Sequence, residues 1–131
     1  MNYSERFSSK FFARLLKPEG QNPIRDRATS FEIIFELLDQ KQKKDNYLIV
    51  ETGCMRGDHK PANSPYALGD DGASTYIFDD FINFYDGEVL SVDIKQANVD
   101  YADKYTSDRT SVYCSDSVKF LWDLDERNKI D

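Results

Sequence analysis

Three short, β-rich runs alternate with helix-like stretches in this chain, and this alternation constrains its fold more than any other feature. The runs are YLIVETG (47–53), EVLSVDI (88–94) and TSVYCSD (110–116), and the stretches with helical spacing that follow them cover 74–85, 96–105 and 117–124. The first run is apolar on both faces, which is typical of a strand covered on both sides of a sheet. Strands that alternate with helices form right-handed crossovers. The pattern therefore predicts an α/β fold with a parallel sheet between two helical layers.

Two further helices are predicted before the first strand. They cover 3–16 and 25–42, and the prolines and glycine of KPEGQNP (17–23) separate them. In the second helix, Phe31, Ile34, Phe35 and Leu38 form one apolar face. We therefore divide the chain into an N-terminal helical extension, 1–45, and an α/β domain, 46–131. Because three strands and their helices make half of a doubly wound domain, we expect this domain to be partial, truncated after the third βα unit.

Composition and charge narrow the classes of function. The chain has 131 residues, a net charge of −7 and a pI of about 4.7, which argues against a nucleic-acid partner because phosphate binding needs a basic surface. The sequence has neither an apolar run of about 20 residues, as a membrane span needs, nor the apolar segment of a signal peptide. Cys54 and Cys114 are predicted at the ends of strands that have another strand between them, too far apart for a disulfide. We expect free thiols, a cytoplasmic location and no membrane partner.

Acidic residues gather where the predicted strands end, which is where ligands bind in open α/β sheets. The candidate binding residues at these ends are Glu51, Gly53, Asp93, Ile94, Asp116 and Ser117. Asp93 is expected either to accept hydrogen bonds from ribose hydroxyls or to cap the next helix. Asp116 is expected either to accept from the amine of an adenine or to cap its own helix. Glu51, in an apolar strand end, is expected to hold backbone amides of the following loop or the ammonium group of a ligand.

The glycine pattern bears on which nucleotide-like ligand such a site takes. The G-x-G-x-x-G fingerprint of dinucleotide-binding turns is absent after the first strand, and so is a Walker sequence. Asp70 and Asp71 would repel a phosphate near the following helix. A ligand with ribose and adenine but without phosphate fits these residues better, and S-adenosylmethionine is such a ligand. A nicotinamide enzyme remains as another hypothesis.

Four segments in the right order give the chain a resemblance to a known family. VETG, GDDGASTYIFDDFI, VLSVDI and YCSDSVKFL resemble the first half of class I S-adenosylmethionine-dependent methyltransferases, in the neighbourhood of macrocin O-methyltransferase. The resemblance covers about 47–131 and implies a Rossmann-like domain. It implies that Glu51 and Gly53 lie near the methionine moiety, with Gly72, Ala73 and Ser74 at the start of the following helix. It further implies that Asp93 binds the ribose and that Asp116 and Ser117 frame the adenine.

The leading hypothesis is therefore a methyltransferase in which this chain carries the cofactor-binding half. The expected reaction is O-methylation of a small molecule or sugar, and the acceptor is not specified. No residue is assigned as catalytic, no metal site is expected, and His59 is interpreted as a solvated loop residue. The alternative is a non-catalytic truncated fragment that serves as a binding or oligomerising module, and a homo-oligomer is open under both hypotheses.

Overall fold

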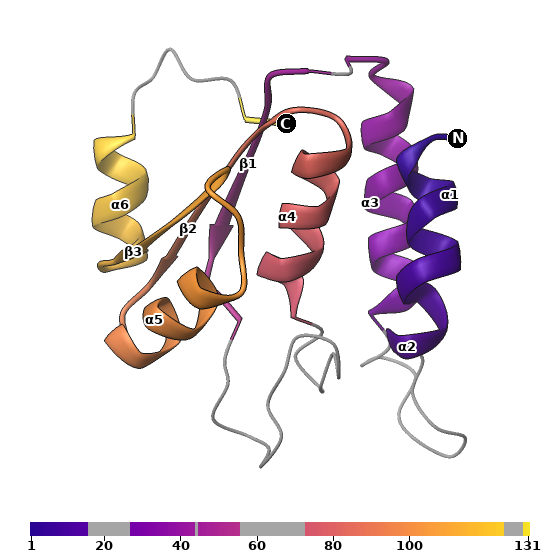
Figure 1. Ribbon diagram of the computed structural model, residues 1–131. Coiled ribbons are helices and arrows are strands. Elements are labelled where there is room, and N and C mark those ends of the chain that lie inside the picture. Colours follow the sequence, from indigo (N-terminus) through magenta and orange to yellow (C-terminus); the bar gives the residue numbers. More distant parts are fainter. Residues whose placement is uncertain (16–26, 44, 56–72, 125–129) are drawn as a thin grey trace.

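The computed structural model describes residues 1–15, 27–43, 45–55, 73–124 and 130–131, which form an α/β fold (Figure 1). Three short pieces form the first helical stretch: α1 (Tyr3–Phe7), η1 (Ser8–Phe12), which is a π-helix, and α2 (Ala13–Leu15). The remaining elements are α3 (Ala28–Gln40), β1 (Tyr47–Thr52), α4 (Ser74–Phe84), β2 (Gly87–Asp93), α5 (Gln96–Lys104), β3 (Thr110–Cys114) and α6 (Ser117–Asp123). The predicted order of strands and helices is confirmed, with bounds that differ by a residue or two over most of the described chain.

The strands form a parallel sheet in the order β1-β2-β3. Tyr47 lies opposite Gly87 at the start of β1, and Asp93 lies opposite Cys114 where β3 ends. Because all three strands run in the same direction, their carboxyl ends lie along one edge of the sheet. The predicted separation of the cysteines is confirmed: β2 lies between β1 and β3, and both Cys54 and Cys114 are free thiols.

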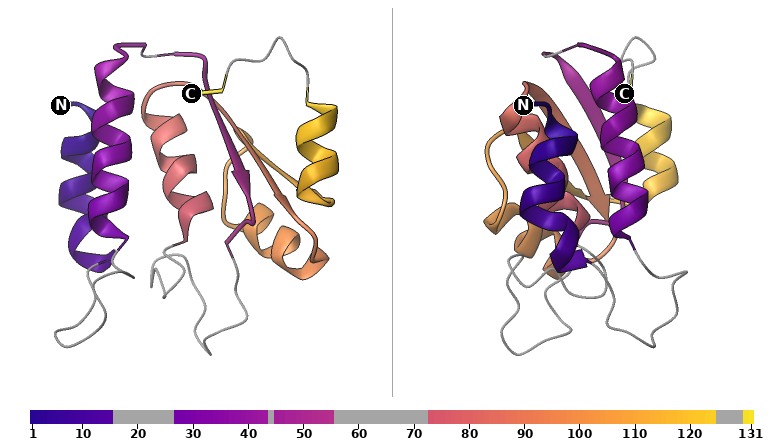
Figure 2. Two further views of the ribbon diagram at one scale, coloured as in Figure 1. Left: turned by 180° about the vertical axis from the view of Figure 1, so that it is seen from behind. Right: turned by 90° about the vertical axis from the view of Figure 1, so that its right-hand side faces the viewer.

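Helices lie on both sides of the strands. In the right-hand view of Figure 2, α4 and α5 lie on one side of the sheet and α6 on the other. The side with α4 holds the core, where Tyr47 and Ile49 of β1 join Ile77 and Phe81 of α4 in one buried apolar cluster. The helix α6 contributes no buried residue. The two faces of the sheet are therefore covered unequally.

The N-terminal helices pack against α4 through aromatic side chains. Tyr3 is fully buried and lies edge-on to Phe35 of α3 and Phe81 of α4, at centroid distances of 4.6 and 5.0 Å. Phe35 also stacks on Phe81 at 5.4 Å. Each such ring buries a large apolar area and gains from edge-to-face contact. The helical extension and the sheet therefore share one core, and the boundary between 45 and 46 stays a prediction.

Two half-buried carboxylates anchor the same helices. Asp80 of α4 accepts hydrogen bonds from the Tyr3 hydroxyl and from the side chains of Arg6 and Lys10, at 2.8 to 3.0 Å. Asp39 of α3 accepts from the backbone N–H groups of Tyr3 and Ser4, which lie in the first turn of α1. A helix begins with N–H groups that lack intrahelical partners, and a carboxylate from a neighbouring helix satisfies them here.

The residues 130–131 return to the open edge of β1. The Asp131 N–H donates to the Leu48 carbonyl at 2.8 Å, and the Asp131 carboxylate accepts from the Leu48 N–H at 2.9 Å. The N–H groups of Tyr47 and Gly53 point the other way, toward β2. Since the backbone groups of a strand alternate in direction, Asp131 lies on the side of β1 opposite β2.

Candidate functional site

Two adjoining cavities lie at the carboxyl edge of the sheet, where the sequence predicted a ligand. The larger, about 480 Å³, lies between the ends of β1 and β2 and the starts of α3, α4 and α5. The smaller, about 350 Å³, continues toward the end of β3. Thr52, Gly53, Asp93 and Ile94 line both cavities. These volumes fall in the range of about 300–1,000 Å³ that small-molecule sites occupy.

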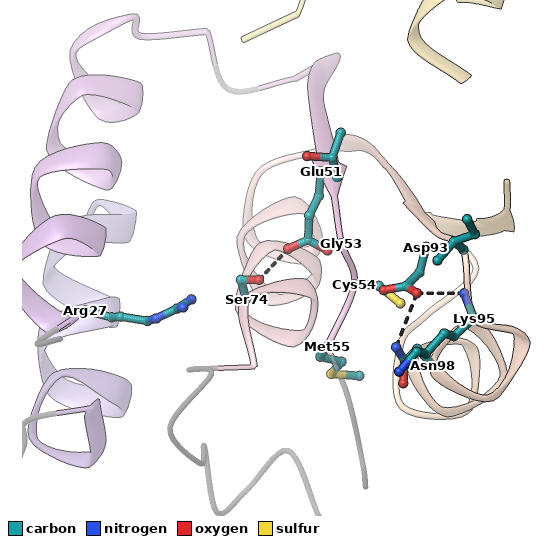
Figure 3. A pocket seen from close by; sticks show the side chains of 11 residues that line it. Arg27, Glu51, Gly53, Cys54, Met55, Ser74, Asp93, Lys95 and Asn98 are labelled. Carbon is teal, nitrogen blue, oxygen red and sulfur yellow. Dashed lines mark hydrogen bonds between the residues drawn. The ribbon is translucent and has the colours of Figure 1, made fainter. Parts of the chain in front are cut away.

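Glu51 is the buried acid of the larger cavity (Figure 3). Its Oε1 accepts from the hydroxyls of Thr75 and Ser91, the latter at 2.7 Å, and its Oε2 accepts from Ser74. Burial raises the pKa of the Glu51 carboxyl, and the three hydroxyl hydrogen bonds and the charge of Arg27 act in the opposite direction. A carboxylate accepts about four hydrogen bonds, so one acceptor direction on Oε2 is left for a ligand.

Thr75 extends this network to the loop after β1. Its hydroxyl donates to Glu51 and accepts from the backbone N–H of Met55 at 2.9 Å. The sequence predicted that Glu51 holds the amides of this loop or the ammonium of a ligand. Among the described residues, Glu51 binds the loop only indirectly, because the Thr75 hydroxyl lies between the Glu51 carboxylate and the Met55 N–H.

The turn after β1 passes close to the cavities. Gly53 has a φ of +82°, in the left-handed region that favours glycine, and its N–H donates to the Val92 carbonyl at 2.7 Å. A Cβ on Gly53 would meet nothing within 4 Å among the described residues, and Gly53 lines both cavities. Cys54 and Met55, which follow, are buried and line the larger cavity. Burial, with Asp93 and Glu51 nearby, raises the pKa of the Cys54 thiol to about 12.

Asp93 ends β2 between the two cavities. Its Oδ1 accepts from the Lys95 N–H at 2.8 Å and from the Asn98 side-chain amide at 3.2 Å. One predicted alternative was that Asp93 caps the next helix. It is met only in part, because the N-cap residue of α5 is Lys95 and Asp93 bonds the N–H of that residue and not an N–H inside the helix. No backbone or amide N–H of the described residues donates to the other oxygen, Oδ2, whereas the Cys54 thiol interacts with the same carboxylate. Asn98 and Lys95 therefore fix the carboxylate and leave one oxygen available to a ligand.

Asp116 caps the last helix, which is one of the two alternatives predicted for it. Its Oδ1 accepts from the N–H groups of Val118 and Lys119 at 2.9 and 3.1 Å. Asp116 and Ser117 line the smaller cavity, and a contact with adenine stays a prediction. Ile94 lines both cavities and is 71 % exposed, so it offers an apolar surface next to Asp93.

The start of α4 contributes to the larger cavity through Ser74, which follows a residue with an unusual backbone. Ala73 has a φ of +47°, although it carries a Cβ. Gly72 and His59 lie outside the described residues. Within the parts that are described, no group of three or more His, Cys, Asp or Glu side chains could hold a metal ion. No helix in those parts has the length and apolar character to cross a membrane.

Among the lining residues that were not predicted from the sequence are Arg27, Lys95 and Asn98. Arg27 precedes α3 and extends toward Glu51 and Ser74, whereas Lys95 and Asn98 lie with Asp93 on the far side of the β1 end (Figure 3). A motif search in the strand ends could have included Lys95, which is two residues from Asp93. Arg27 carries no such signal, because only the packing of α3 beside β1 brings it to the site.

The comparisons with known proteins identify no relative: no family model, no curated protein and no solved structure matches this chain.

Proposed function

We propose that this chain is the cofactor-binding part of an S-adenosylmethionine-dependent methyltransferase that acts on a hydroxyl of a small molecule or sugar. The observation that carries the proposal is the carboxylate of Asp93. It is held by Asn98 and Lys95 at the end of β2, with one oxygen left over, beside the open turn at Gly53. Such a carboxylate suits two vicinal ribose hydroxyls.

The sheet topology supports a Rossmann-like assignment. In a doubly wound sheet the first three strands lie in the order 3-2-1 and the chain then crosses to the other edge of the first strand. The order β1-β2-β3 and the position of Asp131 on the far edge of β1 agree with this scheme. The order of strands would then reverse at β1, and ligands bind at such a reversal. The candidate site lies at the end of this strand.

The residues around the cavities suit each part of the proposed cofactor. Asp93 lies in the middle, where it would bind the ribose, and Ile94 and Asp116 line the smaller cavity, where the adenine would lie. The larger cavity, with Glu51 and Ser74, would hold the methionine part. Two carboxylates in this cavity attract a sulfonium and an ammonium group and disfavour a phosphate.

When bound, S-adenosylmethionine would supply an electrophilic methyl group to the acceptor hydroxyl, with S-adenosylhomocysteine as the leaving group and the hydroxyl proton passing to a base. The described residues contribute binding and orientation, which is how such an in-line transfer gains most of its rate. We assign none of them as the base that takes the proton.

Isothermal titration calorimetry with S-adenosylhomocysteine tests the proposal. We expect binding to the wild type and an affinity at least about tenfold weaker for Asp93→Ala, because a charge-assisted pair of hydrogen bonds to the ribose is lost. Asp103→Ala removes an exposed acid of α5 that lines neither cavity, and this variant should bind as the wild type does. An absence of heat with the wild type, or binding of NADH in its place, contradicts the proposal.

A second candidate is a non-catalytic module that associates with a further copy of itself. The observation that favours it is the outer face of α6, where Val118, Leu121 and Trp122 are 72, 45 and 87 % exposed. Apolar side chains gathered on one exposed face are typical of interaction surfaces. Sedimentation velocity should then show a dimer that Trp122→Ser converts to a monomer, and a monomeric wild type at high concentration would contradict this candidate.

A further inference from the structure

We propose that Arg27 binds the carboxylate at the amino-acid end of the ligand, so that the site selects adenosyl amino acids over adenosyl compounds that lack this group. The inference rests on the proposed function and deepens it. It assigns a binding role to a residue outside the strand ends, and it fixes the direction in which the ligand lies.

The first support is the state of the Arg27 side chain. Arg27 is exposed, lines the larger cavity and, as the N-cap residue of α3, makes no side-chain hydrogen bond to cap the helix. No hydrogen bond or ion pair joins its guanidinium to any residue that the structure describes. The other described arginines have partners: Arg6 and Arg109 form ion pairs with aspartates, and Arg14 lies over the ring of Phe11. Arg27 is therefore available for an anionic ligand.

The second support is the position of Arg27 relative to Glu51. The side chain extends from α3 toward Glu51 and Ser74 across the cavity (Figure 3), and its charge acts against the burial that raises the pKa of the Glu51 carboxyl. An amino acid carries its ammonium and its carboxylate on the same carbon atom, so it needs an anion and a cation that face one another. The open acceptor direction on Glu51 Oε2 suits the ammonium, and the guanidinium suits the carboxylate through a paired hydrogen bond.

A second cation, Lys95, lies in the same cavity but in a different place. Its backbone N–H donates to Asp93, so Lys95 belongs to the part of the cavity that would bind the ribose. Arg27 lies on the α4 side with Ser74 (Figure 3). A ligand with its ribose on Asp93 therefore directs its amino-acid end toward Arg27. A phosphate at Arg27 would carry two negative charges into a cavity with two carboxylates, whereas a zwitterion adds no net charge.

The experiment compares two ligands that differ in the amino-acid end. S-Adenosylhomocysteine carries the ammonium and the carboxylate, and 5′-methylthioadenosine has the same adenosine and sulfur without them. Calorimetry measures both with the wild type, Arg27→Gln and Lys95→Gln, the last being a matched loss of one positive charge in the same cavity. We expect Arg27→Gln to weaken S-adenosylhomocysteine by about 10- to 100-fold and to leave 5′-methylthioadenosine within about twofold. Lys95→Gln should leave the ratio of the two affinities unchanged.

The possible results separate this inference from the proposed function. If the wild type binds neither ligand, both fail. If the wild type binds S-adenosylhomocysteine and Arg27→Gln keeps the same ratio of affinities, the inference alone is overturned. It is also overturned if Lys95→Gln changes the ratio more than Arg27→Gln does, or if the wild type prefers adenosine 5′-monophosphate and Arg27→Gln removes that preference. Circular dichroism checks the fold of each variant, and the exposed positions of Arg27 and Lys95 predict native spectra.

Discussion

At the scale of single residues, two carboxylates at neighbouring strand ends do different work. Glu51 is buried and accepts three hydroxyl hydrogen bonds from α4 and β2, so it joins these elements to β1. Asp93 is half-buried, and its hydrogen bonds from Lys95 and Asn98 use the same oxygen. Glu51 therefore stabilises the end of the sheet with one acceptor direction to spare, whereas Asp93 keeps a whole oxygen for a ligand.

Replacing Glu51 by glutamine should destabilise the fold. The amide has one acceptor oxygen in place of two, so at least one of the hydroxyls of Ser74, Thr75 and Ser91 loses its acceptor. We expect the free energy of unfolding in urea to fall by about 1–3 kcal/mol. Glu88→Gln, on the exposed part of β2, is the matched control and should change it little.

The pH dependence of the same variant has a defined sign. Burial raises the pKa of Glu51, so between the ordinary and the raised pKa the native state binds a proton that the unfolded state has released. This group therefore costs stability as the pH rises through that window, and Glu51→Gln should remove that part of the pH dependence. Urea titrations of both proteins from pH 4 upward measure it, and parallel curves would contradict the assignment.

The two cysteines should differ in reactivity. Cys54 is buried with a thiol pKa of about 12, whereas Cys114 is exposed. Because the thiolate is the reacting form, iodoacetamide at pH 8 should alkylate Cys114 well before Cys54. Mass spectrometry of tryptic peptides over time gives the two rates. The variant Cys114→Ser identifies the peptide that carries Cys54. Equal rates at the two cysteines would contradict this prediction, because Cys54 would then become accessible faster than it is alkylated.

At the scale of elements, the first helix is attached to the sheet layer by aromatic packing and by the cluster at Asp80. Burial alone would raise the pKa of Asp80, but the hydrogen bonds from Arg6, Lys10 and Tyr3 outweigh burial and lower it. Such a carboxylate stabilises the folded state at pH values above its unfolded pKa and loses this effect as the pH falls. The attachment of α1 to α4 is therefore sensitive to acid.

Asp80→Asn should loosen α1 from α4. It removes the ion pairs with Arg6 and Lys10 and weakens the bond to the buried Tyr3 hydroxyl. We expect a loss of about 1.5–3 kcal/mol at neutral pH, which shrinks below about pH 4 as the wild-type carboxyl becomes protonated. Thermal unfolding of both proteins from pH 7 to pH 3 measures the difference. An Asp103→Asn control, at an exposed acid, should show neither effect.

At the scale of the whole molecule, Asp131 connects the edge of the sheet to the residues that follow α3. Asp131 binds Leu48 in β1, and its carboxylate pairs with Lys41 and Lys43 at 2.8 and 2.7 Å. Burial alone would raise its pKa, but the lysines and the Leu48 N–H lower it to about 2. Next to it, Ile34, Leu37 and Ile130 line an apolar cavity of about 370 Å³ between α3 and the edge of β1.

Removing the Asp131 side chain should expose the start of β1. Asp131→Ala leaves the Leu48 N–H without its carboxylate acceptor, and hydrogen exchange at this amide should accelerate. We expect a loss of about 1–2 kcal/mol, modest because both lysines are partly exposed. The contribution is present above the ordinary carboxyl pKa of 3.8 and disappears as the pH falls through about 2. Asp123→Ala is the control, and equal exchange at Leu48 in all three proteins would contradict this role.

The sequence by itself determined the α/β class, the order of the elements and the strand ends that line the cavities. These depend on local periodicity and on turn residues, as in YLIVETG and in the spacing of Phe31, Phe35 and Leu38 in α3. The separation of Cys54 from Cys114 followed from the same parallel order. The methyltransferase assignment and its cofactor stay proposals, because no relative and no ligand tests them.

The tertiary structure decided which of these residues meet and what each face contacts. Glu51 finds Ser74 and Ser91 only when α4 and β2 pack beside β1, and Arg27 reaches the cavity only because α3 lies next to that strand. One oxygen of Asp116 caps α6. The sequence had left open whether Asp116 caps this helix or binds an adenine. Periodicity places Val118, Leu121 and Trp122 on one helical face, but a periodic pattern says which residues lie together and not what lies opposite them. In this structure that face points to solvent.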